Sequence, residues 1–244
     1  HDPLLGSCCG APTASVDAIT EQYGRPFINP TSCSGRLMLP PPGLGAMTVD
    51  ASLAEDARRA RLVDLVRDLS FLDGGSDDAF TLASGRTSRW FFDLKPAMMH
   101  PEAARLIGAL ICARLPAYGA DIVGGLELGA VPLTALVIAN ADAPETLRGI
   151  MVRKEPKGRG GRKTNNPPGV EGSSLSGGGR IVVLEDVTTT GGSAVKAVQR
   201  LQAETECEVV GVISILDRQE GGAEAFAAAG IPFESLLVRS DIAG

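Results

Sequence analysis

The sequence is poor in histidine, because His1 and His100 are the only two among 244 residues. A histidine-rich metal site and a Ser-His-Asp triad are therefore not expected. His100 precedes Pro101 at a predicted helix start, so we interpret it as a helix-start residue rather than a ligand. The five cysteines are scattered and form no pair of Cys-x-x-Cys units, which argues against a zinc site of that type and favours a reducing cytoplasm.

The chain also lacks any apolar run close to the roughly 20 residues that are needed to cross a bilayer. Its formal net charge of −6 provides no general attraction to nucleic acid or to membrane surfaces. Neither nucleic acid nor a membrane is therefore expected as a partner. A length of 244 residues is enough for one α/β domain with a tail.

The first 46 residues differ in composition from the rest of the chain. They are rich in proline, glycine and serine, and they carry no sustained hydrophobic period. We therefore predict that residues 1–46 are a disordered leader or a non-native extension. Met47 opens a sequence of ordinary globular character, and residues 47–244 are expected to form the functional domain.

Beyond Met47, strand and helix patterns alternate along the chain. A helical face carries apolar residues from Leu53 to Leu69, and a second helix opens at Pro101 and carries apolar residues as far as Leu115. Strands are predicted at Asp121–Gly124, Gly149–Arg153, Arg180–Asp186, Val209–Asp217 and Ser235–Val238. Helices are predicted at Val131–Ala141, Ser193–Glu204 and Gly222–Ala229. This alternation indicates an α/β fold with a mostly parallel, doubly wound sheet flanked by helices.

The most informative stretch runs from Ile181 to Ser193. Its apolar start, Ile181–Leu184, has the character of a central parallel strand, and such sheets bind ligands beyond the carboxyl ends of their strands. Glu185 and Asp186 follow directly, and they suit the hydroxyls of a sugar or a cation that bridges to phosphate. The loop Thr188–Ser193 offers hydroxyls, backbone N–H groups and a helix N-terminus, which suit a phosphate monoester. A plain strand–turn–helix does not explain two adjacent acids where desolvation makes unpaired charge costly.

This order of strand, two acids, Thr/Gly loop and helix resembles the 5-phosphoribosyl-1-pyrophosphate (PRPP) motif of type I phosphoribosyltransferases. The resemblance implies that the two acids contact the ribose hydroxyls and that the loop holds the 5-phosphate. It implies a PRPP site that includes Glu185, Asp186, Val187, Thr188, Thr189, Thr190, Gly191, Gly192 and Ser193. It also implies a type I phosphoribosyltransferase fold for residues 47–244.

A second signal is a basic segment inside an acidic protein. From Arg153 to Lys163, six Lys or Arg residues stand against the single Glu155, which gives a net charge of +5. The stretch from Lys154 to Gly179 is predicted to be one long connection, and connections of that length are usually functional or disordered. A solvated charged loop is the alternative, although a strand end in this fold aims the segment at the ligand crevice.

The pattern Arg153-Lys154-x-x-Lys157 resembles the flexible catalytic loop of orotate phosphoribosyltransferases. The resemblance implies that the loop closes over PRPP and that Lys157 contacts the departing pyrophosphate across the interface of a homodimer with shared active sites. It adds Arg153, Lys154, Lys157 and Arg159 to the PRPP site. It makes Lys157 and Asp186 the catalytic residues. Arg159 stands where the family usually has His, and Arg keeps the charge but does not titrate near neutral pH.

The segment Phe80–Arg86, followed by Phe91-Phe92-Asp93, resembles the N-terminal hood of the same family. The resemblance assigns Phe91 and Phe92 to orotate, on whose flat ring the aromatic pair stacks. Because neighbouring strand residues point to opposite faces, we expect only one of the two rings to touch ligand. Packing in the strand core remains the alternative for both rings. Ala83 stands where many members carry Lys, which removes one cation.

Two further segments resemble parts of the family's substrate site. Leu216–Gly222 resembles its Asp-Arg-Gln-Glu segment, which implies that Arg218 meets the orotate carboxylate. A guanidinium fork suits a planar carboxylate through paired hydrogen bonds, and a surface pair of Arg218 with Asp remains the alternative. The resemblance also assigns Thr189 to orotate. Gly124–Ala130 resembles the pyrophosphate loop, where glycine allows close backbone approach.

These matched segments stand in the family's order between Met47 and Gly244, so the chain resembles orotate phosphoribosyltransferases. The resemblance implies a cytoplasmic enzyme that transfers a pentosyl group from PRPP to orotate in pyrimidine nucleotide synthesis. Mg²⁺ is the implied cofactor, held through PRPP and water rather than directly by the protein. Two other functions stay open. A purine phosphoribosyltransferase has no use for a carboxylate-binding Arg218, and a PRPP-sensing regulator would need a nucleic-acid-binding module that residues 1–46 do not resemble.

Overall fold

A computed structural model of the protein describes most of the chain after the predicted leader. The described residues are 54–81, 85–141, 146–155 and 164–244. All of them belong to the unit that spans Met47–Gly244. The predicted leader of residues 1–46 lies outside the described residues, and so do Ala83, Lys157 and Arg159.

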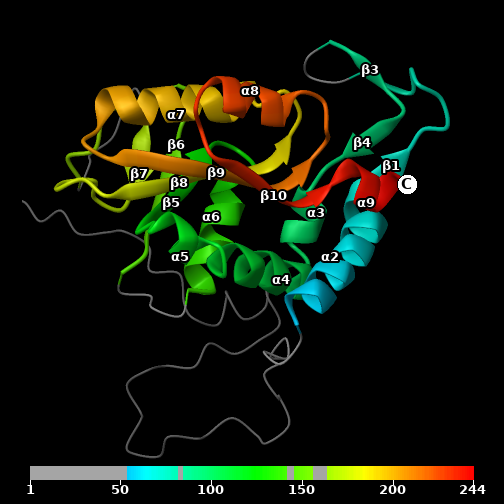
Figure 1. Cartoon of the computed structure of the whole chain (residues 1–244), viewed down its shortest axis with the longest axis horizontal. Helices are drawn as coiled ribbons and strands as arrows, with labels where there is room; N and C mark the ends of the chain where they lie inside the picture. Colours follow the sequence, from blue (N-terminus) through cyan, green and yellow to red (C-terminus); the bar gives the residue numbers. More distant parts are fainter. Residues whose placement is uncertain (1–53, 82–84, 142–145, 156–163) are drawn as a thin grey trace, which may run out of the picture. The chain divides into compact units, whose positions relative to one another are not determined.

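A six-stranded sheet organises the described residues in the order β10-β9-β8-β5-β6-β7 (Figure 1). Its strands are β5 (Ile122–Leu126), β6 (Arg148–Val152), β7 (Val170–Gly172), β8 (Arg180–Thr188), β9 (Glu208–Asp217) and β10 (Phe233–Val238). All neighbouring strands are parallel except β7, which pairs antiparallel with β6. The predicted α/β fold with a mostly parallel sheet is confirmed.

Helices cover both faces of this sheet, because its central strands are apolar on both sides. Val182 and Leu184 of β8 pack in one core with the helices α2 and α4, whereas Ile181 and Val183 pack in a second core with α7 and α8. Figure 1 shows α7 and α8 on one side of the sheet and α4 and α6 on the other. The larger helices are α2 (Glu55–Ser70), α4 (Pro101–Cys112), α6 (Ala130–Ala139), α7 (Gly192–Glu204) and α8 (Gly222–Ala228). Short helices are α3 (Lys95–Met98), α5 (Leu115–Tyr118) and α9 (Arg239–Ala243).

The helix that opens at Pro101 is shorter than the sequence pattern predicts. It ends at Cys112, and Leu115 begins the separate helix α5 with Pro116 in its first turn. Proline has no backbone N–H that could continue the hydrogen bonding of the previous helix. The apolar spacing therefore extends beyond the last helical hydrogen bond of α4. The role expected of His100 is confirmed, because its Nδ1 accepts a hydrogen bond of 3.4 Å from the N–H of Ala103.

The long connection after β6 also differs from the prediction of one irregular loop. β7 lies within it and pairs with β6, so that Met151 stands opposite Glu171. Asn166 fixes the following turn, since its side chain donates to Ser173 O and accepts from the N–H of Leu175. Val170–Gly172 therefore form the edge strand of the sheet.

Two small antiparallel pairs precede the main sheet in sequence. β1 (Phe71–Asp73) pairs with β4 (Trp90–Phe92), and β2 (Phe80–Thr81) pairs with β3 (Thr87–Ser88). We call this part of the chain, Phe71–Phe92, the hood. Aromatic contacts join its strands, with ring centroids 5.1 Å apart for Phe71 and Phe92 and 5.6 Å apart for Phe80 and Phe91. Among the described residues, no helix is both long and apolar enough to cross a membrane.

Candidate active site

The carboxyl ends of the parallel strands bring the predicted site residues to one edge of the sheet. Thr188 of β8 is paired with Asp217 of β9, and Arg218 follows directly. The N–H of Arg218 donates a hydrogen bond of 2.9 Å to Thr188 O. The acidic motif and Arg218, which are distant in sequence, are therefore neighbours in space.

The loop after β8 ends in an uncapped helix N-terminus. Gly191 is the N-cap of α7 with φ +73°, and no side chain caps the helix there. Only glycine fits easily at this position, since a Cβ would also press on the ring of Phe226 at 3.2 Å. The first backbone N–H groups of a helix have no intrahelical acceptor, and the helix dipole makes this end attractive to anions. The loop can therefore bind a phosphate group.

A cavity of about 420 Å³ lies beside this loop. Its lining joins segments that the sequence analysis assigned to different parts of the substrates. The lining consists of Phe91, Phe92, Glu185, Val187, Thr189, Thr190, Gly191, Gly192, Ser193, Lys196 and Arg218. Phe91 is 37% exposed and Phe92 only 6%, so the first ring is the one accessible to a ligand. We call this cavity the hood-side cavity.

A second cavity of about 190 Å³ lies on the other side of the acids. It is lined by Leu126, Glu127, Leu128, Gly129, Ala130, Lys154, Leu184, Glu185, Asp186, Val187, Ser193 and Ala194. Glu185, Val187 and Ser193 line both cavities, so the two are adjacent. A Cβ at Gly129 would overlap the Asp186 carboxylate, which explains why the loop after β5 needs glycine there. We call this cavity the loop-side cavity.

The first acid of the motif, Glu185, is largely removed from water. Burial, opposed by a hydrogen bond of 2.6 Å from Thr188 Oγ1 and aided by the charges of Asp186 and Asp217, raises the pKa of Glu185 to about 7. Burial also raises the pKa of Asp217. Carboxylates held in a partly desolvated cavity wall cost stability, and such groups are typical of functional sites. Thr188 itself lies outside both linings, so the structure gives it a supporting role beneath Glu185.

Arg218 is 3% exposed and is held by contacts with the hood. Its Nε donates to Glu220 Oε1 at 2.9 Å, and its Nη2 donates to Ser88 Oγ at 3.0 Å and to Trp90 O at 3.1 Å. Its guanidinium carbon lies 5.7 Å from the ring centroid of Phe92. The alternative of a surface pair with Asp is wrong, since the residue is buried and pairs with Glu220. Within the described residues, Nη1 is the one nitrogen of Arg218 that has no hydrogen-bond partner. The pair of parallel hydrogen bonds to a carboxylate that the sequence predicts is therefore not freely available.

The basic segment is described only at its start. Lys154 lines the loop-side cavity, and its N–H donates to Glu127 Oε1 at 2.8 Å. Arg153 turns toward the sheet edge instead, where its Nη1 lies 3.2 Å from Glu171 Oε1. Lys157 and Arg159 lie outside the described residues. Their predicted roles therefore rest on the resemblance alone.

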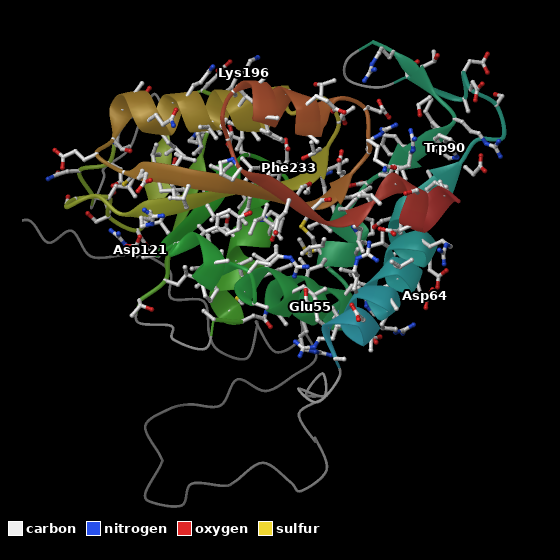
Figure 2. All side chains as sticks on the ribbon, in the orientation of Figure 1. Glu55, Asp64, Trp90, Asp121, Lys196 and Phe233 are labelled. Carbon is white, nitrogen blue, oxygen red and sulfur yellow. The ribbon has the colours of Figure 1, made fainter. Side chains whose placement is uncertain are left out.

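The structure adds residues that the sequence analysis missed. Lys196 lines the hood-side cavity from α7, where Figure 2 labels it, and it follows Gly192 by one helical turn. Glu127 lines the loop-side cavity, and it belongs to the segment Gly124–Ala130 that resembles the pyrophosphate loop. Lys95 pairs with Asp93 at 2.8 Å, and this hydrogen bond raises the Lys95 pKa, with a contribution from the charge of Asp186. The sequence signal that could have identified Lys196 is its spacing of one helical turn after the loop.

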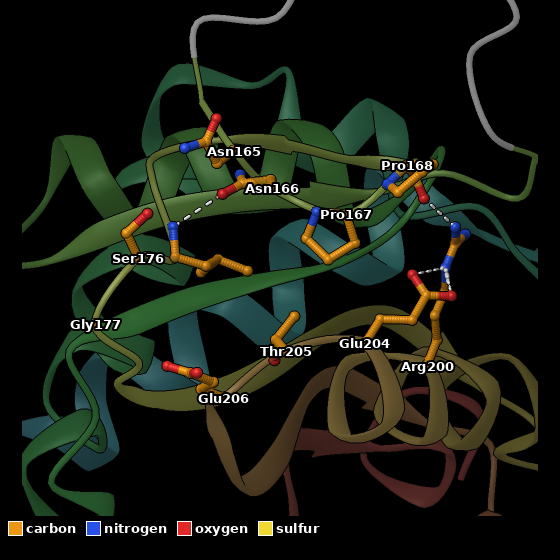
Figure 3. Close-up of a pocket in the computed structure, with 11 residues that line it drawn as sticks. Asn165, Asn166, Pro167, Pro168, Ser176, Gly177, Arg200, Glu204, Thr205 and Glu206 are labelled. Carbon is orange, nitrogen blue, oxygen red and sulfur yellow. Dashed lines mark hydrogen bonds and ion pairs between the residues drawn. The ribbon is translucent and has the colours of Figure 1, made fainter.

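A third cavity, of about 770 Å³, lies away from these residues at the other end of α7 (Figure 3). It is lined by Asn165, Asn166, Pro167, Pro168, Leu175, Ser176, Gly177, Arg200, Glu204, Thr205 and Glu206. No residue that the sequence analysis assigned to substrate lies in it. Within the described residues, no cluster of three or more His, Cys, Asp or Glu side chains could hold a metal ion.

Comparison with known proteins gives consistent names. Orotate phosphoribosyltransferase of Rhodopseudomonas palustris (strain TIE-1) is 45% identical to this chain over 190 residues, which cover 78% of this chain and 98% of that protein. The same enzyme of Bradyrhizobium sp. (strain ORS 278) is 46% identical over 185 residues, covering 75% and 96%. The crystal structure of Mycobacterium tuberculosis H37Rv orotate phosphoribosyltransferase in complex with PRPP aligns with a TM-score of 0.62 and 35% identity, covering 77% of this chain and 99% of that one. No family model matches the chain.

Proposed function

The chain belongs to the orotate phosphoribosyltransferase family, and from this membership we infer that it transfers the 5-phosphoribosyl group of PRPP to orotate. The products are orotidine 5′-monophosphate and pyrophosphate, and the reaction belongs to pyrimidine nucleotide synthesis. The fold is the type I phosphoribosyltransferase fold. The observation that carries this function in the structure is the hood-side cavity, because the phosphate-binding loop, a motif acid, an accessible aromatic ring and Arg218 all line it.

For PRPP, we propose that the 5-phosphate binds at the N-terminus of α7. The uncapped N–H groups after Gly191 support this position, and Lys196 adds a cation to the same cavity wall. Glu185 and Asp186 accept hydrogen bonds from the ribose hydroxyls. The pyrophosphate lies in the loop-side cavity, beside Lys154.

For orotate, we propose a position between Phe91 and Arg218. The exposed ring of Phe91 is available for stacking, whereas Phe92 is buried beneath the guanidinium of Arg218. The Nη1 group of Arg218 donates to the orotate carboxylate. Thr189, which lines the same cavity, supplies a further polar contact to the pyrimidine.

The chemical step displaces pyrophosphate from the anomeric carbon by the N1 nitrogen of orotate. The sugar passes through an oxocarbenium-like state, so the main demand on the protein is to stabilise negative charge on the leaving group. Lys154 lies at that position, and the family resemblance assigns the same task to Lys157. Asp186 and Glu127 offer the carboxylate oxygens that suit the water shell of Mg²⁺. When bound with PRPP, Mg²⁺ neutralises pyrophosphate oxygens.

We also propose a cytoplasmic homodimer with shared active sites, because Lys157 of the family loop acts across a subunit interface. Residues 1–46 are proposed to lie outside the catalytic domain. The match with the Rhodopseudomonas relative supports this, because 190 residues already cover 98% of that protein. A chain that begins at Met47 should keep the melting temperature and the turnover number of the full chain. A loss of either would contradict a dispensable leader.

A turnover assay with three acceptors tests the function directly. Orotate, adenine and hypoxanthine are each offered with PRPP, with and without Mg²⁺, and the protein is checked for folding by circular dichroism. We expect turnover of orotate alone and only with Mg²⁺. Turnover of a purine would favour the purine phosphoribosyltransferase, and a folded protein that binds PRPP without turning over any acceptor would favour the regulator.

A further inference from the structure

Glu220 joins the two parts of the chain that form the hood-side cavity. It follows β9 by three residues, and its side chain is only 16% exposed. Its Oε1 accepts a hydrogen bond of 2.9 Å from Arg218 Nε, and its Oε2 accepts one of 2.9 Å from Arg86 Nη2 in the hood. One carboxylate thus binds two guanidinium groups, one from the strand end and one from the hood.

The contact with Glu220 restricts the orientation of Arg218. A guanidinium has five N–H groups, of which Nε carries one and each Nη carries two. Glu220 Oε1 lies 2.9 Å from both Nε and Nη2, and Ser88 and Trp90 also accept from Nη2, so three partners fix the plane of the group. The remaining N–H pair, on Nη1, is the part of Arg218 that a cavity ligand can use.

We propose that Glu220 is a positioning residue for orotate, which it serves by holding Arg218 with Nη1 toward the carboxylate of the pyrimidine. This inference rests on the proposed function. Glu220 does not line the hood-side cavity. Its effect on orotate passes through its contacts with Nε and Nη2 of Arg218.

Charge and position predict opposite effects when Glu220 is removed. Glu220 offsets part of the positive charge of Arg218, so a purely electrostatic role predicts tighter orotate binding in Glu220→Ala. A positioning role predicts weaker binding, because a guanidinium without this partner can leave the orientation that suits the ligand. The direction of the change therefore distinguishes the two roles.

The main experiment compares Glu220→Ala and Glu220→Gln with the wild type in steady-state kinetics. We expect Glu220→Ala to lower kcat/KM for orotate by about tenfold, which is typical for the loss of one hydrogen bond to a charged group, while KM for PRPP changes less than about twofold. Glu220→Gln keeps an acceptor of the same shape and should recover most of the loss. An unchanged or improved kcat/KM for orotate in Glu220→Ala would overturn the proposal. If Glu220→Ala does not fold, Glu220→Gln carries the test. A Glu220→Gln variant in which kcat/KM for orotate and KM for PRPP are altered to the same degree would also overturn the proposal.

Two further variants separate positioning of Arg218 from general support of the hood. Arg86→Met removes only the outer partner of Glu220 and should leave kcat/KM for orotate within about twofold of the wild type. In an Arg218→Met background, adding Glu220→Ala should have little further effect, because its route to orotate is already lost. A full additional loss in the double variant, or a loss in Arg86→Met as large as in Glu220→Ala, would overturn the inference. A folded wild type that does not turn over orotate would instead overturn the proposed function, and this inference with it.

Discussion

The two ends of α7 carry cavities of very different character. At its C-terminal end lies the cavity of about 770 Å³, and at its N-terminal end lie the hood-side and loop-side cavities of about 420 and 190 Å³. In the larger cavity, Arg200 is already paired with Glu204 and donates to Pro168 O (Figure 3). Arg200 also donates to Arg153 O. In the smaller ones, the helix N-terminus is uncapped and Arg218 Nη1 has no partner among the described residues.

This difference shows that volume alone does not indicate where the chemistry lies. Binding of a charged substrate needs polar groups that have no other partner, and the N-terminal end of α7 supplies them. The helix dipole adds to the contrast, because it favours anions at the N-terminus and disfavours them at the C-terminus. Glu204 and Glu206 lie at that C-terminal end, so the larger cavity is unsuited to the phosphates of PRPP.

The largest expected effect concerns the leaving group at the N-terminal end. Lys157→Ala should lower kcat by about 10²- to 10³-fold, because the removal of one preorganised charge at developing negative charge has effects of this size. KM for PRPP should change much less, since the contact strengthens in the transition state. Steady-state kinetics measure both quantities. Lys163→Ala, in the same basic segment but outside the family pattern, is the matched control and should stay near wild type.

The same variant tests whether active sites are shared between subunits. Lys157→Ala and Asp186→Ala should each have strongly reduced activity alone, and mixing them should raise the activity, because one site of a mixed dimer keeps both residues. Subunit exchange is verified by differently tagged chains. If exchange occurs and no activity returns, Lys157 acts within its own chain.

The next largest effect is a selective weakening of the binding of one substrate. Arg218→Met should weaken orotate binding by about 1.5–3 kcal/mol, as expected for a lost hydrogen bond to a charged group, and should affect PRPP less. Arg89→Met is the control, since Arg89 is a hood residue that pairs with Asp73 and does not line the cavity. KM values for both substrates are measured at saturating co-substrate. An equal loss for orotate and PRPP would mean that Arg218 mainly supports the hood.

A smaller effect concerns the dependence of stability on pH. The native state holds the Glu185 proton up to about pH 7, whereas the unfolded chain loses it near 4.5. Between these values the native state binds more protons, so this group makes the free energy of unfolding fall as pH rises. Glu185→Gln cannot titrate, and its unfolding free energy should fall less over that range.

Urea unfolding at several pH values measures this difference. Glu206→Gln, beside the larger cavity, is the matched control and should follow the wild-type dependence. A Glu185→Gln variant that tracks the wild type across the whole range would show that Glu185 is ionised in the native protein well below pH 7.

Some parts of the fold and of the site can be predicted from the sequence and others cannot, and the reason is physical. The central strands were predicted because each is a buried apolar run, and their ends were correct to within a few residues. β7 and β1 were missed because a strand of three residues shows no period. The PRPP motif was predicted because its residues are contiguous in the chain, from Glu185 to Ser193.

The surroundings of Arg218 could not be predicted in the same way. Its partner Ser88 lies 130 residues away, so their contact depends on how the hood packs against the sheet. The sequence indicated that Arg218 is functional, but it could not show that Nε and Nη2 are already engaged. The same holds for Glu220, because its partner Arg86 in the hood lies 134 residues away.

The smallest expected effect is the one that most directly tests the comparison of the two cavities. Ser176 and Thr190 are both exposed, and they line the larger cavity and the hood-side cavity respectively. Ser176→Phe places a bulky ring in the larger cavity and should leave kcat and both KM values within about twofold of the wild type, because surface substitutions away from a site change little. Thr190→Phe, the matched variant, crowds the phosphate loop and should raise KM for PRPP by about tenfold or more through steric exclusion of the 5-phosphate. A loss of activity in Ser176→Phe, with its melting temperature unchanged, would show that the C-terminal end of α7 takes part in the reaction. The engagement of Arg200, the one cation among the described residues of that lining, would then be no guide to function, and the contrast between the two ends would fail.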